Sequence, residues 1–223
     1  MRNKVLTLLY IIAVAVLILT ISIGLPIYVR PFYYMQIKSL GLEEYSGYTL
    51  SQIITAYDSV LNYLTLPFTK FSVGELPYSN EGYLHFKDCK ALFMLNFYGL
   101  VISLAVTVLL SVLNKKGKIS LIKFKGFTPA FYSAIIALVI PLSLGTIAVV
   151  NFDVAFKLFH TILFPGKDNW LFDPYDDPII MLLPEEFFMA CGILIAVSIL
   201  AICLTIITVN LVKKFSYNKK KSK

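Results

Sequence analysis

The chemistry that this sequence could perform centres on His85 and His160, the only two histidines among its 223 residues. Each lies in a polar stretch beside a long apolar run. Histidine has an ordinary pKa of about 6.5, which suits proton transfer near neutral pH. If the two stretches meet, the histidines would form one acid–base site. Each also has a simpler alternative: His85 as a surface residue in a local charge pair, and His160 as an interfacial residue packed among aromatic rings.

The first polar stretch, residues 80–93, reads NEGYLHFKDCKALF. In a helix, Asp88 would lie one turn after His85 and Glu81 one turn before it, so the three would share a face. A carboxylate beside an imidazole fixes its tautomer and favours its protonated form. The spacing therefore predicts that Asp88 orients His85, although a histidine followed three residues later by an aspartate is a weak motif.

The second polar stretch, residues 159–186, contains His160, the only tryptophan, Trp170, and six of the thirteen acidic residues. Asp173 and Asp177 each precede a proline, which is typical of turns. One hypothesis is that these aspartates mainly hold the loop. The other is that they attract a positively charged substrate.

Several familiar chemistries lack their motifs in this sequence. It has no G-x-S-x-G elbow, P-loop, dinucleotide fingerprint, H-E-x-x-H or calcium-binding loop. The three cysteines have no metal-type spacing. We therefore expect no cofactor and no metal. A metal site built from both histidines and several aspartates stays open as an alternative without diagnostic spacing.

The elements that must position these residues are predicted to be membrane helices. The chain is 58% hydrophobic and only 15% charged, with a mean hydropathy of +0.77, far more apolar than a soluble domain. A spanning helix needs about 20 apolar residues. We predict a mainly α, polytopic membrane protein, a single domain over residues 1–223, with four spans at residues 5–29, 92–113, 129–150 and 187–212. The first run is too long for a signal peptide.

The two segments outside the spans on one side, residues 30–91 and 151–186, are predicted to build a cap. Residues 50–64 have apolar spacings of three and four, which predict an amphipathic helix capped by Thr49 or Ser51. A further helix should begin near Asn80, and residues 71–83 could form a short strand or a loop. Pro141 predicts a kink in the third span.

The distribution of charge predicts the orientation in the membrane. The termini and the loop at residues 114–128 carry thirteen Lys and Arg and no acid, whereas the other side carries seven basic residues and all thirteen acids. The positive-inside rule then places both termini in the cytoplasm and both histidine segments outside. The net charge of +7 is explained by lysines that contact anionic lipid headgroups, so nucleic acid is not an expected partner.

The two histidine segments resemble one known family, the bacterial lipoprotein intramolecular transacylases. The similarity rests on H-F-K-D-C-K-A-L-F before the second span and on F-H-T-I-L-F-P followed by W-L-F-D-P-Y-D-D-P-I-I-M-L-L-P-E-E-F-F before the fourth, and it covers almost the whole chain. The family reads nearer to H-L-x-D-V-K in the first block. Phe86 and Cys89 are therefore departures, and they leave His85, Asp88 and Lys90 in place.

The resemblance implies an enzyme of the bacterial plasma membrane whose substrate is a diacylglyceryl-modified lipoprotein. Such an enzyme moves the sn-2 acyl chain to the α-amine of the substrate's own N-terminal cysteine and gives the lyso-form. His85 would take the amine proton and return it to the departing oxygen, while His160 would share proton transfer or stabilise the oxyanion. Supporting or substrate-positioning roles would fall to Asp88, Lys90, Trp170, Asp173, Tyr175 and Asp177.

Two rival functions use the same sequence features differently. A non-enzymatic membrane module would bind a partner protein or a metal through the outer segments. A small transporter would need charges in the middle of its spans, and these are missing from the apolar runs.

Overall fold

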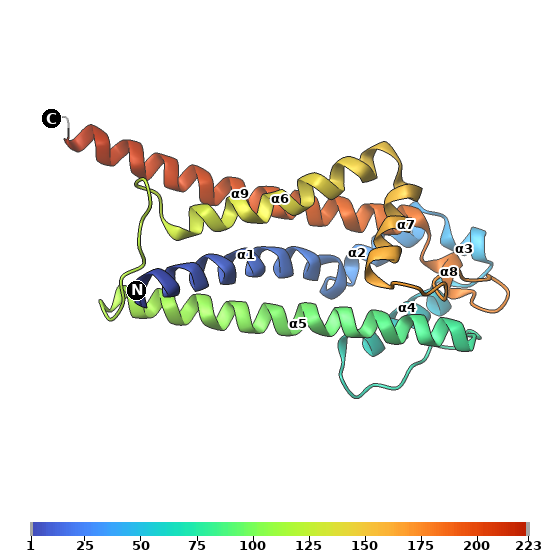
Figure 1. The fold of residues 1–223 in the computed structure, drawn as a ribbon. Helices are drawn as coiled ribbons and strands as arrows, with labels where there is room; N and C mark the ends of the chain where they lie inside the picture. Colours follow the sequence, from blue (N-terminus) through green and yellow to red (C-terminus); the bar gives the residue numbers. More distant parts are fainter. Residues whose placement is uncertain (1, 222–223) are drawn as a thin grey trace. The chain divides into compact units, whose positions relative to one another are not determined.

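The computed structural model describes the backbone of residues 2–221, and it describes their side chains except at residues 2, 140–150, 217, 218, 220 and 221. Within this range the chain is mainly helical, and its only β contact is an isolated bridge between Phe124 and Phe127. The helices (Figure 1) are α1 (Arg2–Tyr28), α2 (Pro31–Ser39), α3 (Leu42–Ser46), α4 (Leu50–Thr65), α5 (Asn80–Lys115), α6 (Pro129–Val150), α7 (Phe152–Leu163), α8 (Ile179–Leu182) and α9 (Glu185–Lys221).

Three of these helices are long and apolar enough to cross a membrane. The segments concerned are Asn3–Tyr28, Asn80–Lys115 and Glu185–Ser216. The second has 36 residues, or about 54 Å at 1.5 Å per residue, well beyond the ~30 Å of a bilayer's hydrocarbon core. The first three turns of α5 therefore precede the span that we assign to residues 92–113. The described apolar part of α6, Pro129–Val139, is shorter, so a fourth span and the kink at Pro141 stay predictions.

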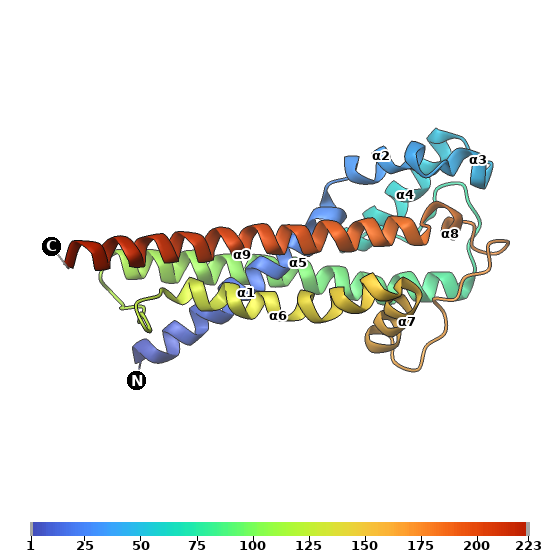
Figure 2. The same cartoon turned by 90° about the horizontal axis from the view of Figure 1, so that it is seen from above.

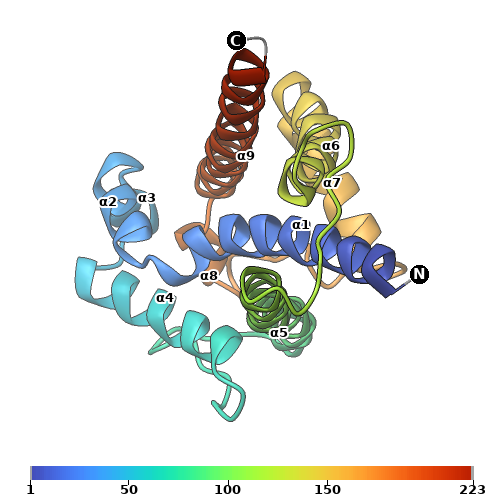
Figure 3. The ribbon, with the colours of Figure 1, turned by 90° about the vertical axis from the view of Figure 1, so that its left-hand side faces the viewer.

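The chain divides into two compact units, and the long helices contribute to both. Unit 1 comprises Met1–Ile23, Phe97–Thr146 and Ile195–Lys223. In unit 1, α1 lies between α5 and the pair formed by α6 and α9 (Figures 1 and 3), and seen from above it crosses the long helices obliquely (Figure 2). Its core joins side chains of α1, α6 and α9, namely Val14, Ile18, Ala134, Ala137, Ile199 and Cys203.

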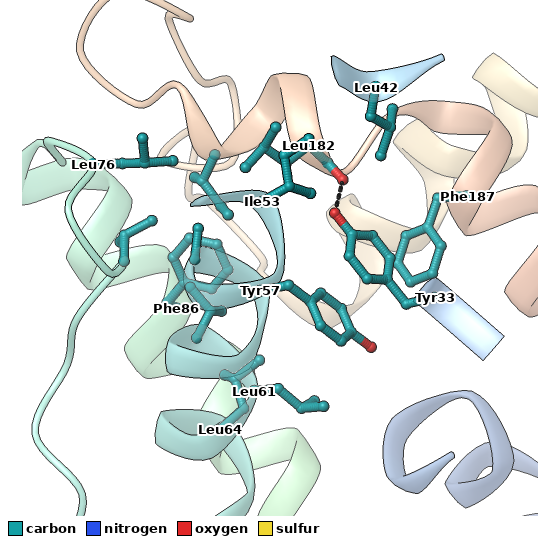
Figure 4. Packing of buried hydrophobic residues seen from close by; sticks show 14 of the residues in the cluster. Tyr33, Leu42, Ile53, Tyr57, Leu61, Leu64, Leu76, Phe86, Leu182 and Phe187 are labelled. Carbon is teal, nitrogen blue, oxygen red and sulfur yellow. Dashed lines mark hydrogen bonds between the residues drawn. The ribbon is translucent and has the colours of Figure 1, made fainter. Parts of the chain in front are cut away.

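Unit 2, which comprises Gly24–Asn96 and Ile147–Leu194, holds both histidines and the larger core. At its centre Tyr33 stacks on Tyr57 with ring centroids 3.7 Å apart, and the Tyr33 hydroxyl donates to the carbonyl of Leu182 at 2.8 Å (Figure 4). That hydrogen bond joins α2 to α8, far apart in the sequence. The core therefore ties the segment before α5 to the segment before α9.

Helix α4 confirms the predicted amphipathic helix. Thr49 is its N-cap, and Thr49 and Gln52 form a reciprocal capping box. The apolar face is buried in the core of unit 2 through Ile53, Ala56, Tyr57, Val60, Leu61 and Leu64.

The segment between α4 and α5 is a loop, so the possible strand is not formed there. Gly74 adopts a positive φ of 65°, and a β-carbon at this position would lie 3.2 Å from the backbone nitrogen of Ala56. Glycine therefore lets the loop approach α4 closely. Helix α5 then begins at Asn80, as predicted, and the first turn of α9 contains Glu185 and Glu186.

Candidate active site

His85 lies in the second turn of α5 and is only 6% exposed. Three rings surround it, with centroid distances of 5.0 Å to Phe164, 5.3 Å to Phe172 and 5.9 Å to His160. Phe164 and Phe172 come from the loop that joins α7 to α8, so this loop forms one wall of the site. The two histidine stretches thus meet within unit 2.

Cys89 provides one polar contact of the His85 ring. The Nε2 of His85 lies 3.3 Å from the Sγ of Cys89, one turn along α5. Burial raises the pKa of the Cys89 thiol to about 12, so this group stays protonated. A thiol can donate to a ring nitrogen or accept from it, and only the His85 tautomer with its proton on Nδ1 has a free lone pair on Nε2.

Asn169 is a second polar side chain near the His85 ring. It lies close enough to raise the pKa of His85, yet neither the Nδ1 of His85 nor the Oδ1 of Asn169, both buried, has a hydrogen-bond partner among the described residues. A small movement would let Nδ1–H donate to this oxygen. The sequence offered no signal for Asn169, because in G-K-D-N-W it is typical of a turn.

Burial keeps His85 neutral. The loss of solvation is the main cause that lowers its pKa to about 4, and the nearby His160 lowers it further. Asn169 and Asp88 oppose this shift, but they do not reverse it. Near neutral pH the imidazole is therefore unprotonated, and its lowered pKa makes it a weaker base than a free histidine.

His160 lies near the end of α7, a helix whose N-cap Asn151 accepts a hydrogen bond from the backbone of Val154. The Nδ1 of His160 lies 2.8 Å from the carbonyl oxygen of Phe156, so Nδ1 carries the proton and the lone pair is on Nε2. Trp170 stacks on the ring at 4.5 Å. Burial lowers the pKa of His160, and the hydrogen bond to Phe156 partly opposes this.

The two imidazoles lie close together. Their ring centroids are 5.9 Å apart and their planes differ by 30°. Rings this close can both contact one bound substrate.

Two of the predicted aspartates have partners other than the histidines. Asp88 binds the Nζ of Lys167 at 2.7 Å, and among the described residues it makes no hydrogen bond to His85. Asp177 is 3% exposed and accepts hydrogen bonds from the backbone nitrogen of Ser79 at 2.9 Å and from its hydroxyl at 2.6 Å. Asp88 thus acts on His85 only through its charge, while Asp177 ties its loop to the start of α5.

The remaining predicted residues do not contact the histidine rings in the part of the chain that is described. Asp173 is exposed and accepts from the backbone nitrogen of Tyr175, whose own side chain is 93% exposed. Lys90 lies over the ring of Tyr63 at 4.2 Å. Of the supporting residues, only Trp170 packs directly against a histidine.

A cavity of about 630 Å³ in unit 2 is lined by Leu84 and other residues near His85 in the sequence, but not by His85 itself. Asn169 lines it, as do the members of the Asp88–Lys167 ion pair. The rest of the lining comes from Glu81, Leu84, Lys87, Asp168 and Leu171. No group of three or more His, Cys, Asp or Glu side chains gathers in a metal-binding arrangement among the described residues.

Long apolar helices and a buried pair of histidines are the features of a helical membrane protein with a candidate acid–base site. The model of the lipoprotein intramolecular transacylase Lit family matches residues 8–188, and the chain belongs to this family. The resemblance predicted from the two histidine segments is thereby confirmed.

Solved structures agree with this membership. The membrane-integral lipoprotein intramolecular transacylase Lit from Bacillus cereus matches with a TM-score of 0.83 and 27% identity, over 100% of this chain and 99% of that one. Two further structures of the Bacillus cereus protein, with the mutations H85R and H85A, match with a TM-score of 0.77 and 25% identity over 100% of this chain and 95% and 96% of theirs. A comparison with curated protein sequences gave no match.

Proposed function

We propose that this protein moves an acyl chain within one lipoprotein, from the sn-2 ester of its diacylglyceryl group to the α-amine of its N-terminal cysteine. Family membership supports the class of reaction. The observation that carries the mechanism is the pair of buried imidazoles, 5.9 Å apart. The product would be the lyso-form lipoprotein.

Both reacting groups belong to one substrate molecule, so the protein mainly has to fold that molecule into a reactive geometry. Good orientation of intramolecular partners can supply about 7–11 kcal/mol. The amine nitrogen forms a bond to the ester carbonyl carbon, and the bond from that carbon to the glycerol oxygen then breaks. The nitrogen loses one proton and the glycerol oxygen gains one, so no co-reactant is needed.

His85 takes the amine proton and passes a proton to the glycerol oxygen. In the tautomer with its proton on Nδ1, its Nε2 holds a lone pair, and the S–H of Cys89 is a weak donor that the arriving amine can displace. A positioned base of this kind contributes about 10²–10⁴-fold to the rate.

His160 shares the proton transfer. Neutral His160 has its only N–H directed at the Phe156 carbonyl, which leaves a basic Nε2 and no free donor. An oxyanion needs a donor, so of the two roles considered for His160 the hydrogen bonding favours proton transfer.

Mass spectrometry of a lipoprotein N-terminus, made with and without this protein, tests the proposal. We expect one acyl chain to move from glycerol to nitrogen, and we expect His85→Gln and His160→Gln to slow the transfer by about 10²–10⁴-fold. Tyr45→Phe, at a side chain that is 67% exposed, is the control. An unchanged diacylglyceryl form with the intact protein would refute the reaction, and a fully active His85→Gln would remove His85 from its role.

A further inference from the structure

Helix α7, which carries His160, presents an apolar stripe that is exposed among the residues that the structure describes. Val154, Leu158 and Ile162 recur every fourth residue and are 53%, 38% and 60% exposed. Phe159, which is 53% exposed, lies beside this stripe. Helix α4 in the same unit is also amphipathic, but it buries its apolar side chains in the core. The apolar stripe of α7 therefore needs another environment.

The other two stripes of α7 interact with residues of unit 2. Phe156 and His160 face the site, where the Phe156 ring contacts Trp170 and Phe188. Asp153 and Lys157 form a polar stripe and interact electrostatically with Glu185 at the start of α9. One side of α7 is thus catalytic, one is polar and one is apolar and exposed.

We propose that α7 lies in the plane of the membrane surface, with Val154, Leu158 and Ile162 inserted among the acyl chains of the lipids. A helix with one apolar and one charged side is the usual form of such an interfacial segment. The neighbouring surface also supports lipid as the partner. Helix α7 packs on Phe188, and the next turns of α9 expose Met189 and Ile193 at 41% and 58% within a candidate membrane span.

Insertion of α7 would also set the depth of the catalytic imidazole. His160 lies on the same two-turn segment as Leu158 and Ile162, so it would be held near the level where lipid esters lie. This consequence rests on the proposed function, because the ester is the group that His160 would act on. The insertion itself does not depend on it.

Fluorescence quenching by brominated lipids tests the insertion, because Trp170 is the only tryptophan in the chain. In a Trp170→Phe background, a single tryptophan is placed at Ile162, at Val154 or, as the control on the polar stripe, at Lys157. The variants are reconstituted in phosphatidylcholine vesicles with bromine at carbons 6 and 7 of one acyl chain. Circular dichroism checks that each one is folded.

We expect Ile162→Trp and Val154→Trp to be quenched at least about twofold more strongly than Lys157→Trp. Equal quenching at all three positions would overturn the proposal, as would strong quenching only at Lys157→Trp. Two apolar positions are used so that one misfolded variant does not decide the result. The readout needs no lipoprotein, so its failure is distinguishable from failure of the proposed acyl transfer.

Discussion

Replacement of Gly82 by alanine should destabilise the protein, although alanine is the better helix former. Gly82 lies in the first turn of α5, and a β-carbon there would overlap the Oδ1 of Asp177 and come within 2.8 Å of its Cγ. Such a contact is too close for either atom to stay. The buried carboxylate, bonded twice to Ser79, would have to move.

The expected decrease in the free energy of unfolding follows from those two hydrogen bonds. A hydrogen bond to a charged group contributes about 1.5–3 kcal/mol, so loss of both would cost about 3–6 kcal/mol. Exchange of glycine for alanine in a helix returns about 1 kcal/mol. The net loss should be about 2–5 kcal/mol, and for a chain of this size even 2 kcal/mol would lower the melting temperature by about 4–8 °C.

Thermal unfolding in one detergent or nanodisc, together with the transfer assay, measures the effect. The matched control is Gly192→Ala in α9, because a β-carbon at Gly192 meets no atom within 4 Å. The control should be neutral or up to about 1 kcal/mol more stable. Acyl transfer should fall in Gly82→Ala, because the displaced loop carries Asn169 and Phe172 away from His85.

A more stable Gly82→Ala variant would refute this reasoning. An increase in melting temperature equal to that of Gly192→Ala would mean that Asp177 is not held against the start of α5. The double variant Gly82→Ala, Asp177→Gly removes the overlap. It should therefore lose less stability than the sum of its two single changes.

Four further predictions use the same assays. Tyr33→Phe leaves the carbonyl of Leu182 without its donor, so it should lower the free energy of unfolding by about 1–3 kcal/mol while transfer activity persists. An unchanged melting temperature would contradict this expectation. Asn169→Ala removes a group that raises the pKa of His85, so it should slow transfer. The loss should be smaller than the roughly 10²–10⁴-fold expected of His85→Gln, and full activity would contradict a positioning role of Asn169. Because the pKa of folded His85 is lowered to about 4, transfer should rise with pH through the amine pKa of about 7.7–8.0 and show no step near 6.5. The same shift means that the unfolded chain binds the proton first, so His85 should make stability fall as pH drops from about 6.5 towards 4, and a stability rise over that range would count against its burial.

Local patterns predicted the elements of unit 2 well. The cap at Thr49 and the start of α5 near Asn80 depend on side chains only a few residues apart. Such contacts are visible in a linear sequence. The meeting of His85 with His160 came from topology, because both segments were expected on one side of the membrane.

Which side chains of the two distant segments pair with each other could not be predicted. Asp88 does share α5 with His85, but it pairs with Lys167, a residue 79 positions away. A rule based on helical spacing considers Asp88 at i+3 from His85. It does not include Lys167, whose ammonium is distant in the sequence and binds Asp88 instead. Asn169 was missed for the same reason, since its importance arises only when its loop folds over His85.

These distant contacts bear on a conflict in the chemistry. Carboxylates near the site would attract the ammonium end of a lipoprotein, but they would also make that ammonium harder to deprotonate. Lys167 compensates the charge of Asp88, and Ser79 donates two hydrogen bonds to Asp177. Glu81 and Asp168 line the same cavity as Asp88 and would attract the ammonium more strongly than the paired Asp88. A free α-amine has a pKa of about 7.7–8.0, so acyl transfer near neutral pH would use the fraction of the amine that is already neutral.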